Sequence, residues 1–220
     1  MANIKINDLY DLSKTIAKEY LEKFEYPWEA LGGLSDYIKE LGNKLPDEFT
    51  KADEDIWIHK DAKVAKTASL NGPLIICKDA EIRHCAFVRG SAIVGEGAVV
   101  GNSTELKNVI LFDKVQVPHY NYVGDSILGY KAHMGAGSIT SNVKSDKLNV
   151  VIKGKGIEIE TNRKKVGAML GDNVEVGCNS VLNPGTILGR AVSVYPCSCV
   201  RGVIEEGSIY KKLGEVVKRL

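Results

Sequence analysis

The sequence places an aliphatic residue at every sixth position, and this period constrains the fold more than any other feature. In a first block these residues are Ile76, Ile82, Val88, Val94, Val100 and Leu106. In a second block they are Leu170, Val176, Leu182, Leu188, Val194 and Val200. Because 44% of the residues are hydrophobic, six such positions in a row are expected by chance in roughly 0.7% of registers. A period of six matches neither an α-helix nor the alternation of a single strand.

A second set of positions, four residues after the aliphatic ones, carries small residues. In the first block they are Ala80, Ala86, Ala92 and Ala98. Six residues suffice for one short strand and one turn, and three such faces close a triangular coil. The aliphatic residue then points into the narrow interior, the small residue lies at a corner, and glycines such as Gly95 and Gly101 relieve crowding beside the aliphatic position. This pattern predicts a mainly β protein built as a parallel β-helix.

The first 50 residues have a helical pattern instead. The apolar positions Leu9, Leu12, Ile16 and Tyr20 recur at steps of three and four residues. Pro27 suits the first turn of a second helix, which Gly42 and Pro46 would end. We therefore expect an N-terminal helical hairpin over residues 1–50.

Residues 51–205 are predicted to form the repeat domain, and residues 142–165 interrupt it. Within the interruption, IKGKGIEIE indicates two strands joined by a glycine-containing turn, either on a binding face or as a solvated hairpin. Residues 206–220 are predicted to form a C-terminal helix, because Ile209, Leu213, Val216 and Leu220 fall on one helical face. The helical hairpin and this helix are expected to cap the open ends of the stack.

Composition excludes several functions. The net charge is +1, so no global field favours nucleic acid or an anionic membrane. No apolar run approaches the roughly 20 residues of a membrane span. The five cysteines are odd in number and no secretory leader precedes them, which favours reduced thiols and a cytoplasmic location.

Four short stretches carry a family resemblance: AFVRGSA, EGAVVGNSTELK, PHYNYVGD and MGAGSITSN, all within residues 86–142. They resemble the acetyltransferase domain of the bifunctional N-acetylglucosamine-1-phosphate uridyltransferase/glucosamine-1-phosphate acetyltransferase family. A looser similarity extends over roughly residues 58–202. The resemblance implies a left-handed parallel β-helix, a homotrimer with acetyl-CoA sites between subunits, and a role in nucleotide-sugar and cell-wall biosynthesis. The uridyltransferase half of that family has no counterpart here, so uridyl transfer is not expected.

The resemblance also assigns roles to individual residues. His119 is the expected general base, since an imidazole commonly titrates near pH 6.5. The substrate-binding residues that the resemblance implies are Arg89, Glu105, Lys107 and Tyr122, together with His133 at a position where the family has asparagine. The implied cofactor-binding residues are Ala136, Asn142 and Cys178, the last at a position where the family commonly has serine. These features predict an acetyl-CoA-dependent N-acetyltransferase that acts on an amino-sugar phosphate or on a nucleotide-linked amino sugar.

Two other functions remain open at this stage. The chain could be a non-catalytic β-helix that binds sugar nucleotides or partners a separate nucleotidyltransferase in a trimer. It could also hold zinc through histidines across subunits, as related β-helical carbonic anhydrases do. Such a site needs three converging histidines, and the distance in sequence from His119 to His133 gives it little support. No resident metal is therefore expected.

Overall fold

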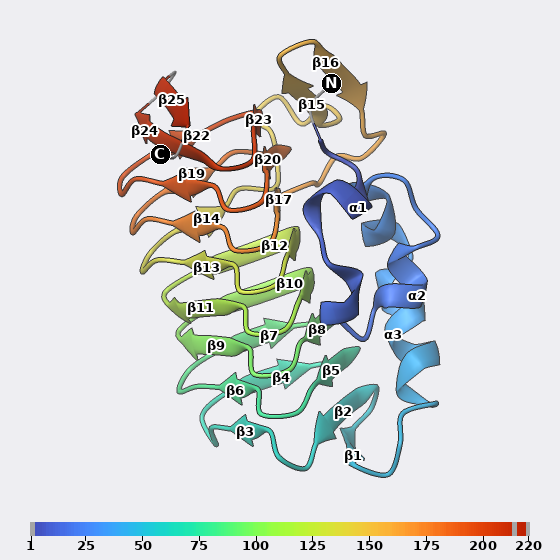
Figure 1. The fold of residues 1–220 in the computed structure, drawn as a ribbon. Helices are drawn as coiled ribbons and strands as arrows, with labels where there is room; N and C mark the ends of the chain where they lie inside the picture. Colours follow the sequence, from blue (N-terminus) through green and yellow to red (C-terminus); the bar gives the residue numbers. More distant parts are fainter. Residues whose placement is uncertain (1–2, 213–214, 219–220) are drawn as a thin grey trace.

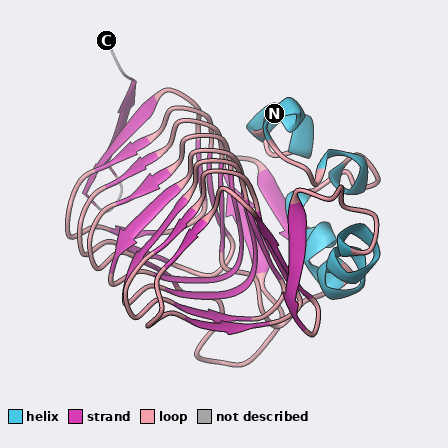
Figure 2. Cartoon of the chain, turned by 90° about the horizontal axis from the view of Figure 1, so that it is seen from below, coloured by secondary structure: helices cyan, strands magenta, loops and turns pink. Residues whose placement is uncertain are grey.

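The structure is a computed structural model that describes residues 3–212 and 215–218. Short parallel strands stack into a triangular column, which Figure 1 shows from the side and Figure 2 along its axis. Each coil contributes to three faces, named A, B and C here in the order in which the chain visits them. The structure confirms the mainly β class and the left-handed parallel β-helix of hexapeptide repeats that the sequence predicts.

Face A is one continuous parallel ladder with a single antiparallel addition at its end. Its strands are β3 (Lys63–Val64), β6 (Glu81–Ile82), β9 (Val99–Asn102), β11 (Gln116–His119), β13 (His133–Met134), β18 (Glu175–Val176), β21 (Ser193–Val194), β24 (Ser208–Lys212) and β25 (Glu215–Lys218).

Faces B and C share two long strands that bend round one corner, β10 (Glu105–Leu111) and β12 (Tyr122–Leu128). Face B also contains β4 (Ser69–Asn71), β7 (Phe87–Arg89), β14 (Ile139–Thr140), β19 (Val181–Leu182) and β22 (Cys199–Val200). Face C also contains β2 (Ile56–His59), β5 (Leu74–Ile76), β8 (Ala92–Val94), β17 (Ala168–Leu170), β20 (Thr186–Leu188) and β23 (Val203–Ile204), with β1 (Phe49–Asp53) antiparallel to β2 at the first coil.

The repeat positions behave as the sequence predicts. The aliphatic residues at the sixth positions of both blocks are at most 4% exposed, and the corner alanines of the first block at most 1%. Gly101 is required where it stands, because a Cβ atom there would overlap the backbone of Pro118 on the next coil. Repeat spacing and corner size thus fix the interior of the column.

Face C is apolar on its outer side as well. Its strands are three-residue apolar runs, and alternation along each strand turns the middle residue outward. These outward residues form a ladder from coil to coil, and each is at most 4% exposed: Trp57, Ile75, Ile93, Ile110, Ile127, Met169 and Ile187. Burying such a ladder requires a cover.

The N-terminal segment supplies that cover, and here the predicted helical hairpin is wrong in form. Five short helical elements replace two long helices: α1 (Ile6–Leu9), η1 (Leu12–Lys14), α2 (Lys18–Leu21), η2 (Pro27–Gly32) and α3 (Leu34–Gly42). They run along face C and do not cap an end of the column (Figure 1). The first predicted helix breaks because its backbone bonds outward: the N–H of Asp172 donates to the carbonyl of Leu9 (3.0 Å), and that of Asp113 to Lys14 (3.0 Å). As expected, one helical element begins at Pro27 and another ends at Gly42.

The interruption at residues 142–165 contains the predicted two strands, β15 (Val151–Gly154) and β16 (Ile157–Glu160), paired antiparallel. Ile152 is fully buried, and Val203 of β23 packs against β15. The hairpin therefore covers the upper part of face C, beyond the reach of the N-terminal segment.

The predicted C-terminal helix over residues 206–220 is wrong. β24 pairs in parallel with β21, and β25 folds back on β24. The open edge of the last coil offers unpaired backbone groups, and satisfying them outweighs the helical spacing of a short segment. Leu213 and Leu220, two of the four residues behind the helix prediction, lie outside the described residues.

None of the described helices has the length and hydropathy needed to cross a bilayer.

Candidate functional site

His119 lies at the corner between faces A and B, at the end of β11, and its side chain is exposed. The same corner on the coil below holds Asn102, its register partner in β9. On the next coil the N–H of Gly137 donates to the carbonyl of His119 (3.0 Å), and the register of β13 and β18 then places Ala136 and Cys178 at this corner in turn. The predicted general base and two predicted cofactor residues therefore occupy one corner on three successive coils.

Four of the five predicted substrate residues lie on face B, which begins just past this corner. Glu105 of β10 is opposite Tyr122 of β12 in register. Arg89, from β7 on the coil below, places its Nε 3.4 Å from a Glu105 carboxylate oxygen. Lys107 follows Glu105 on the same strand and the same side. The structure thus brings Arg89, Glu105, Lys107 and Tyr122 together beside the His119 corner.

Asp125, a residue that sequence reasoning missed, is at the centre of the polar contacts on this face. Only 2% of it is exposed. Its carboxylate accepts hydrogen bonds from Lys107 Nζ (2.9 and 3.0 Å), from Asn108 Nδ2 (2.9 Å) and from Asn142 Nδ2 (2.6 Å). The sequence signal was available, because Asp125 ends the PHYNYVGD stretch and is a charged residue in a strand that is largely apolar.

Asn142 also donates to the Tyr122 hydroxyl oxygen at 3.2 Å. Burial raises the pKa of the Tyr122 phenol, and the bond from Asn142 opposes that shift. Tyr122, a predicted substrate residue, and Asn142, a predicted cofactor residue, are therefore in direct contact. The phenol stays protonated at neutral pH and keeps a hydrogen to donate.

Asn121, also missed by sequence reasoning, holds the backbone at the corner. It is 2% exposed, and its amide oxygen accepts the His119 N–H (3.1 Å). Its amide nitrogen donates to the carbonyls of Gly135 (2.9 Å) and Ser138 (3.1 Å). Asn121 thereby ties the His119 corner to the Ala136 corner on the next coil.

His133 does not join this cluster. It lies on face A, opposite Gln116 and Glu175 in register, and its Nδ1 is 2.8 Å from a Glu175 carboxylate oxygen. Its assignment to the substrate is therefore not supported by proximity to the face B residues within one chain.

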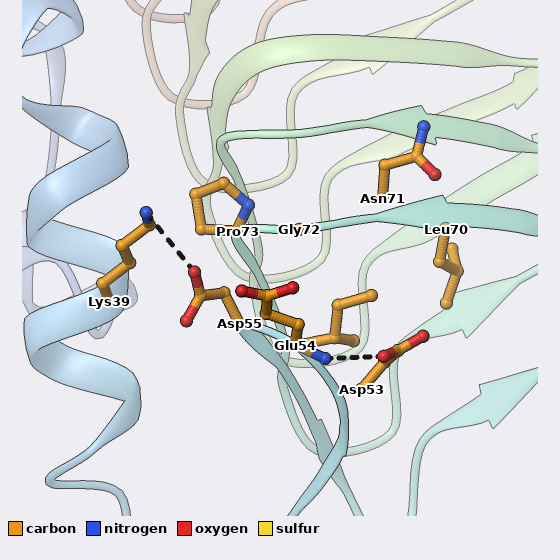
Figure 3. A pocket seen from close by; sticks show the side chains of 9 residues that line it. Lys39, Asp53, Glu54, Asp55, Leu70, Asn71, Gly72 and Pro73 are labelled. Carbon is orange, nitrogen blue, oxygen red and sulfur yellow. Dashed lines mark hydrogen bonds and ion pairs between the residues drawn. The ribbon is translucent and has the colours of Figure 1, made fainter.

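Two of the cavities formed by the described residues lie away from the corner and are lined by charged side chains. One, of about 330 Å³, is at the N-terminal end of the column; Lys39 pairs there with Asp55 (3.4 Å) beside Asp53 and Glu54 (Figure 3). The other, also of about 330 Å³, lies between the β15–β16 hairpin and the last coils and is lined by the cations Lys144, Lys153 and Arg201. Within the described part of the chain, no group of three His, Cys, Asp or Glu residues could hold a metal ion.

Comparison with known proteins finds relatives of this chain. A family model described as the GMPPB C-terminal domain matches residues 70–163. The bifunctional protein GlmU of Methanococcus maripaludis strain C5 is 30% identical over 213 residues, which are 88% of this chain and 48% of the relative. The bifunctional sugar-1-phosphate nucleotidylyltransferase/acetyltransferase of Sulfurisphaera tokodaii is 30% identical over 166 residues, 67% of this chain and 41% of the relative.

Solved structures that match this chain share less sequence with it. The polySia-specific acetyltransferase NeuO is 11% identical with a TM-score of 0.46, and the match covers 76% of this chain and 88% of that one. A variant of AntD, an N-acyltransferase from Bacillus cereus solved with dTDP and coenzyme A, is 16% identical with a TM-score of 0.38, covering 79% and 91%.

The chain spans about half the length of the bifunctional relatives that it matches. The resemblance expected from the sequence is confirmed: this chain is similar, over most of its own length, to bifunctional sugar-1-phosphate nucleotidyltransferase/acetyltransferases of the GlmU type.

Proposed function

We propose that this protein is an acetyl-CoA-dependent N-acetyltransferase that acts on an amino-sugar phosphate or on a nucleotide-linked amino sugar. The observation that carries the proposal is the position of His119 beside Arg89, Glu105, Lys107 and Tyr122 on adjacent coils. An exposed imidazole next to two cations and two hydrogen-bonding groups suits the transfer of an acyl group to the amine of a polar acceptor.

In the proposed reaction the acceptor amine attacks the thioester carbonyl of acetyl-CoA. A C–N bond forms, the C–S bond breaks, and coenzyme A leaves as a thiolate that takes up a proton. His119 removes the proton that the amine loses. No acyl-enzyme is needed, because the thioester is already activated.

The two cations would bind the phosphate of the acceptor. Each already has a carboxylate partner, Glu105 for Arg89 and Asp125 for Lys107. Arg89 approaches Glu105 through its Nε, and a planar guanidinium can bind a phosphate in a bidentate manner. The Arg89 side chain is 47% exposed, which leaves it accessible.

The proposal extends to assembly and location. We propose a homotrimer in the cytoplasm, as the resemblance implies, with the His119 corner facing a neighbouring copy. The cations of the cavity at Lys144, Lys153 and Arg201 would then lie toward the phosphates of coenzyme A.

The test uses His119→Ala and measures coenzyme A release from acetyl-CoA with a panel of amino-sugar phosphates and nucleotide-linked amino sugars. Loss of a general base is expected to lower kcat by about 100-fold or more. His84→Ala is the matched control, because His84 lies at the same corner two coils below, where its Nδ1 is bonded to the Thr67 hydroxyl (2.7 Å).

Equal rates for wild type and His119→Ala with every amine would overturn the proposal. In that case calorimetry with coenzyme A separates the alternatives. Absence of binding, together with a stable complex with a nucleotidyltransferase, would favour the non-catalytic β-helix.

A further inference from the structure

The buried carboxylate of Asp125 determines how its neighbours are oriented. Its side chain is 3% exposed and makes four hydrogen bonds, two at each oxygen. Burying a carboxylate without such partners is strongly unfavourable. A carboxylate that is fully engaged in this way acts only as an acceptor, so every group that faces it must be a donor.

This requirement fixes the orientation of the Asn142 side-chain amide. The two ends of an asparagine amide have nearly the same shape, so hydrogen-bond partners decide its orientation. A reversed amide would place Oδ1 against Asp125 Oδ2, where Nδ2 now lies at 2.6 Å, and the two oxygens would repel. Asp125 therefore turns Nδ2 of Asn142 inward and its Oδ1 away from the carboxylate.

The orientation of the Asn142 amide in turn determines which role the Tyr122 hydroxyl takes in their hydrogen bond. Asn142 Nδ2 lies 3.2 Å from the Tyr122 hydroxyl, whose oxygen must accept in this contact. The hydroxyl hydrogen then points elsewhere. Neither Tyr122 nor Asn142 is fully buried, so a ligand can reach both groups.

We propose that Asp125 is a positioning residue that sets the hydrogen-bond polarity of the acyl-transfer site. Through Asn142 it makes Tyr122 a donor toward an oxygen of the amino sugar and makes Asn142 Oδ1 an acceptor for an amide N–H of the acyl-CoA arm. By holding Lys107 it also places the cation next to that donor. This inference rests on the proposed function.

Asp125→Asn tests the idea, since the substitution keeps the shape of the side chain but adds a donor at one end. The new amide can meet Asn142 in either orientation, and the polarity of Tyr122 is no longer imposed. We expect the KM values for acetyl-CoA and for the amine to rise at least about tenfold, since a buried polar group left unpaired in a site discriminates strongly. Tyr122→Phe is expected to cost affinity in the wild type and little in the Asp125→Asn background, a coupling that a double-mutant cycle measures.

Asp172→Asn is the matched control. Asp172 is also a buried carboxylate, 4% exposed, but it accepts the backbone N–H groups of Asp11 (2.7 Å) in the N-terminal segment and of Tyr130 (2.8 Å) just after β12. Its loss is expected to lower the Tm and to leave both KM values within twofold of the wild type. Unchanged KM values and additive effects with Tyr122→Phe in Asp125→Asn would overturn the inference.

A readout independent of activity separates this inference from the proposed function. In 15N-resolved NMR spectra of the unliganded protein, one side-chain amide proton of Asn142 is expected to exchange slowly and to lose that protection in Asp125→Asn. If the wild type transfers no acetyl group, the proposed function fails while this measurement still decides the role of Asp125. If Asp125→Asn does not fold, Asn142→Asp replaces it: the new carboxylate faces Asp125, and the same rise in KM is expected. A fast-exchanging Asn142 amide in the wild type contradicts the inference.

Discussion

Burial separates the five cysteine side chains into two groups. Cys77 is 3% exposed, and burial raises the pKa of its thiol well above the ordinary value. Cys85, Cys178, Cys197 and Cys199 are exposed. Because the thiolate is the reactive form, a buried thiol with a raised pKa stays protonated and inert at the pH where exposed thiols react.

We predict that iodoacetamide at pH 8 modifies the four exposed cysteines of the native protein and leaves Cys77 unmodified until the chain is unfolded in guanidinium. Mass spectrometry of tryptic peptides gives the extent at each position. Added coenzyme A is expected to slow modification of Cys178 more than that of Cys85, which lies on a coil below His119. Rapid native modification of Cys77 would contradict the assigned burial.

Single residues also show how far the sequence alone could predict the site. Arg89, Glu105, Lys107, Tyr122 and His119 follow from matching motif spacing, and the structure brings them together. Asp125 and Asn121 were missed because their role depends on groups one coil away, 14 to 18 residues along the chain. Motif spacing does not show which polar residue is buried against which.

Among the secondary-structure elements, the repeat could be predicted from the sequence and the terminal segments could not. The strands and corners of the β-helix were predictable, since burial enforces their period. The form of the N-terminal helices and of the C-terminal strands was not predictable, because hydrogen bonds to the column decide it. The carbonyls of Leu9 and Lys14 accept backbone N–H groups of the column, and β24 pairs with the edge strand β21. The three-residue apolar runs of face C did signal a covered face, as fully buried strands do.

The outward ladder of face C is predicted to contribute strongly to stability. Ile93→Ala, at a fully buried ladder position, is expected to lower the free energy of unfolding by about 2–5 kcal/mol, the usual range for such a truncation. Ile16→Ala is the control from the covering segment itself, since Ile16 is 37% exposed, and its cost is expected to be about 1 kcal/mol or less. Urea titration followed by circular dichroism measures both. Equal losses would show that face C is not covered in solution.

For the whole molecule, the cover restricts how copies can meet. Face C is occupied by the N-terminal segment and the β15–β16 hairpin, whereas the helices of the described residues lie away from face A (Figure 2), and His119 is exposed. Association of copies through face C itself would require this cover to be displaced. The exposed aromatic rings of Tyr120 (64%) and Tyr195 (48%) lie on the side of the His119 corner.

We predict that native mass spectrometry finds three copies of the chain in one particle. Coenzyme A is expected to raise the Tm, because a ligand that binds only the native state stabilises it by mass action. A monomer at micromolar concentration would contradict the proposed trimer.

The cover on face C also has a consequence for the order of synthesis. Tyr10 donates its hydroxyl hydrogen to the carbonyl of Ile127, 117 residues later, and the Asp11 N–H meets Asp172, 161 residues later. At the usual pace of translation, Asp172 emerges on the order of 10–30 s after Asp11. During that interval the part of the covering segment around Tyr10 and Asp11 lacks the groups that it finally binds, while unfinished coils present an open edge. This part of the cover is made before the coils on which it lies, and it must wait on the ribosome until they have appeared.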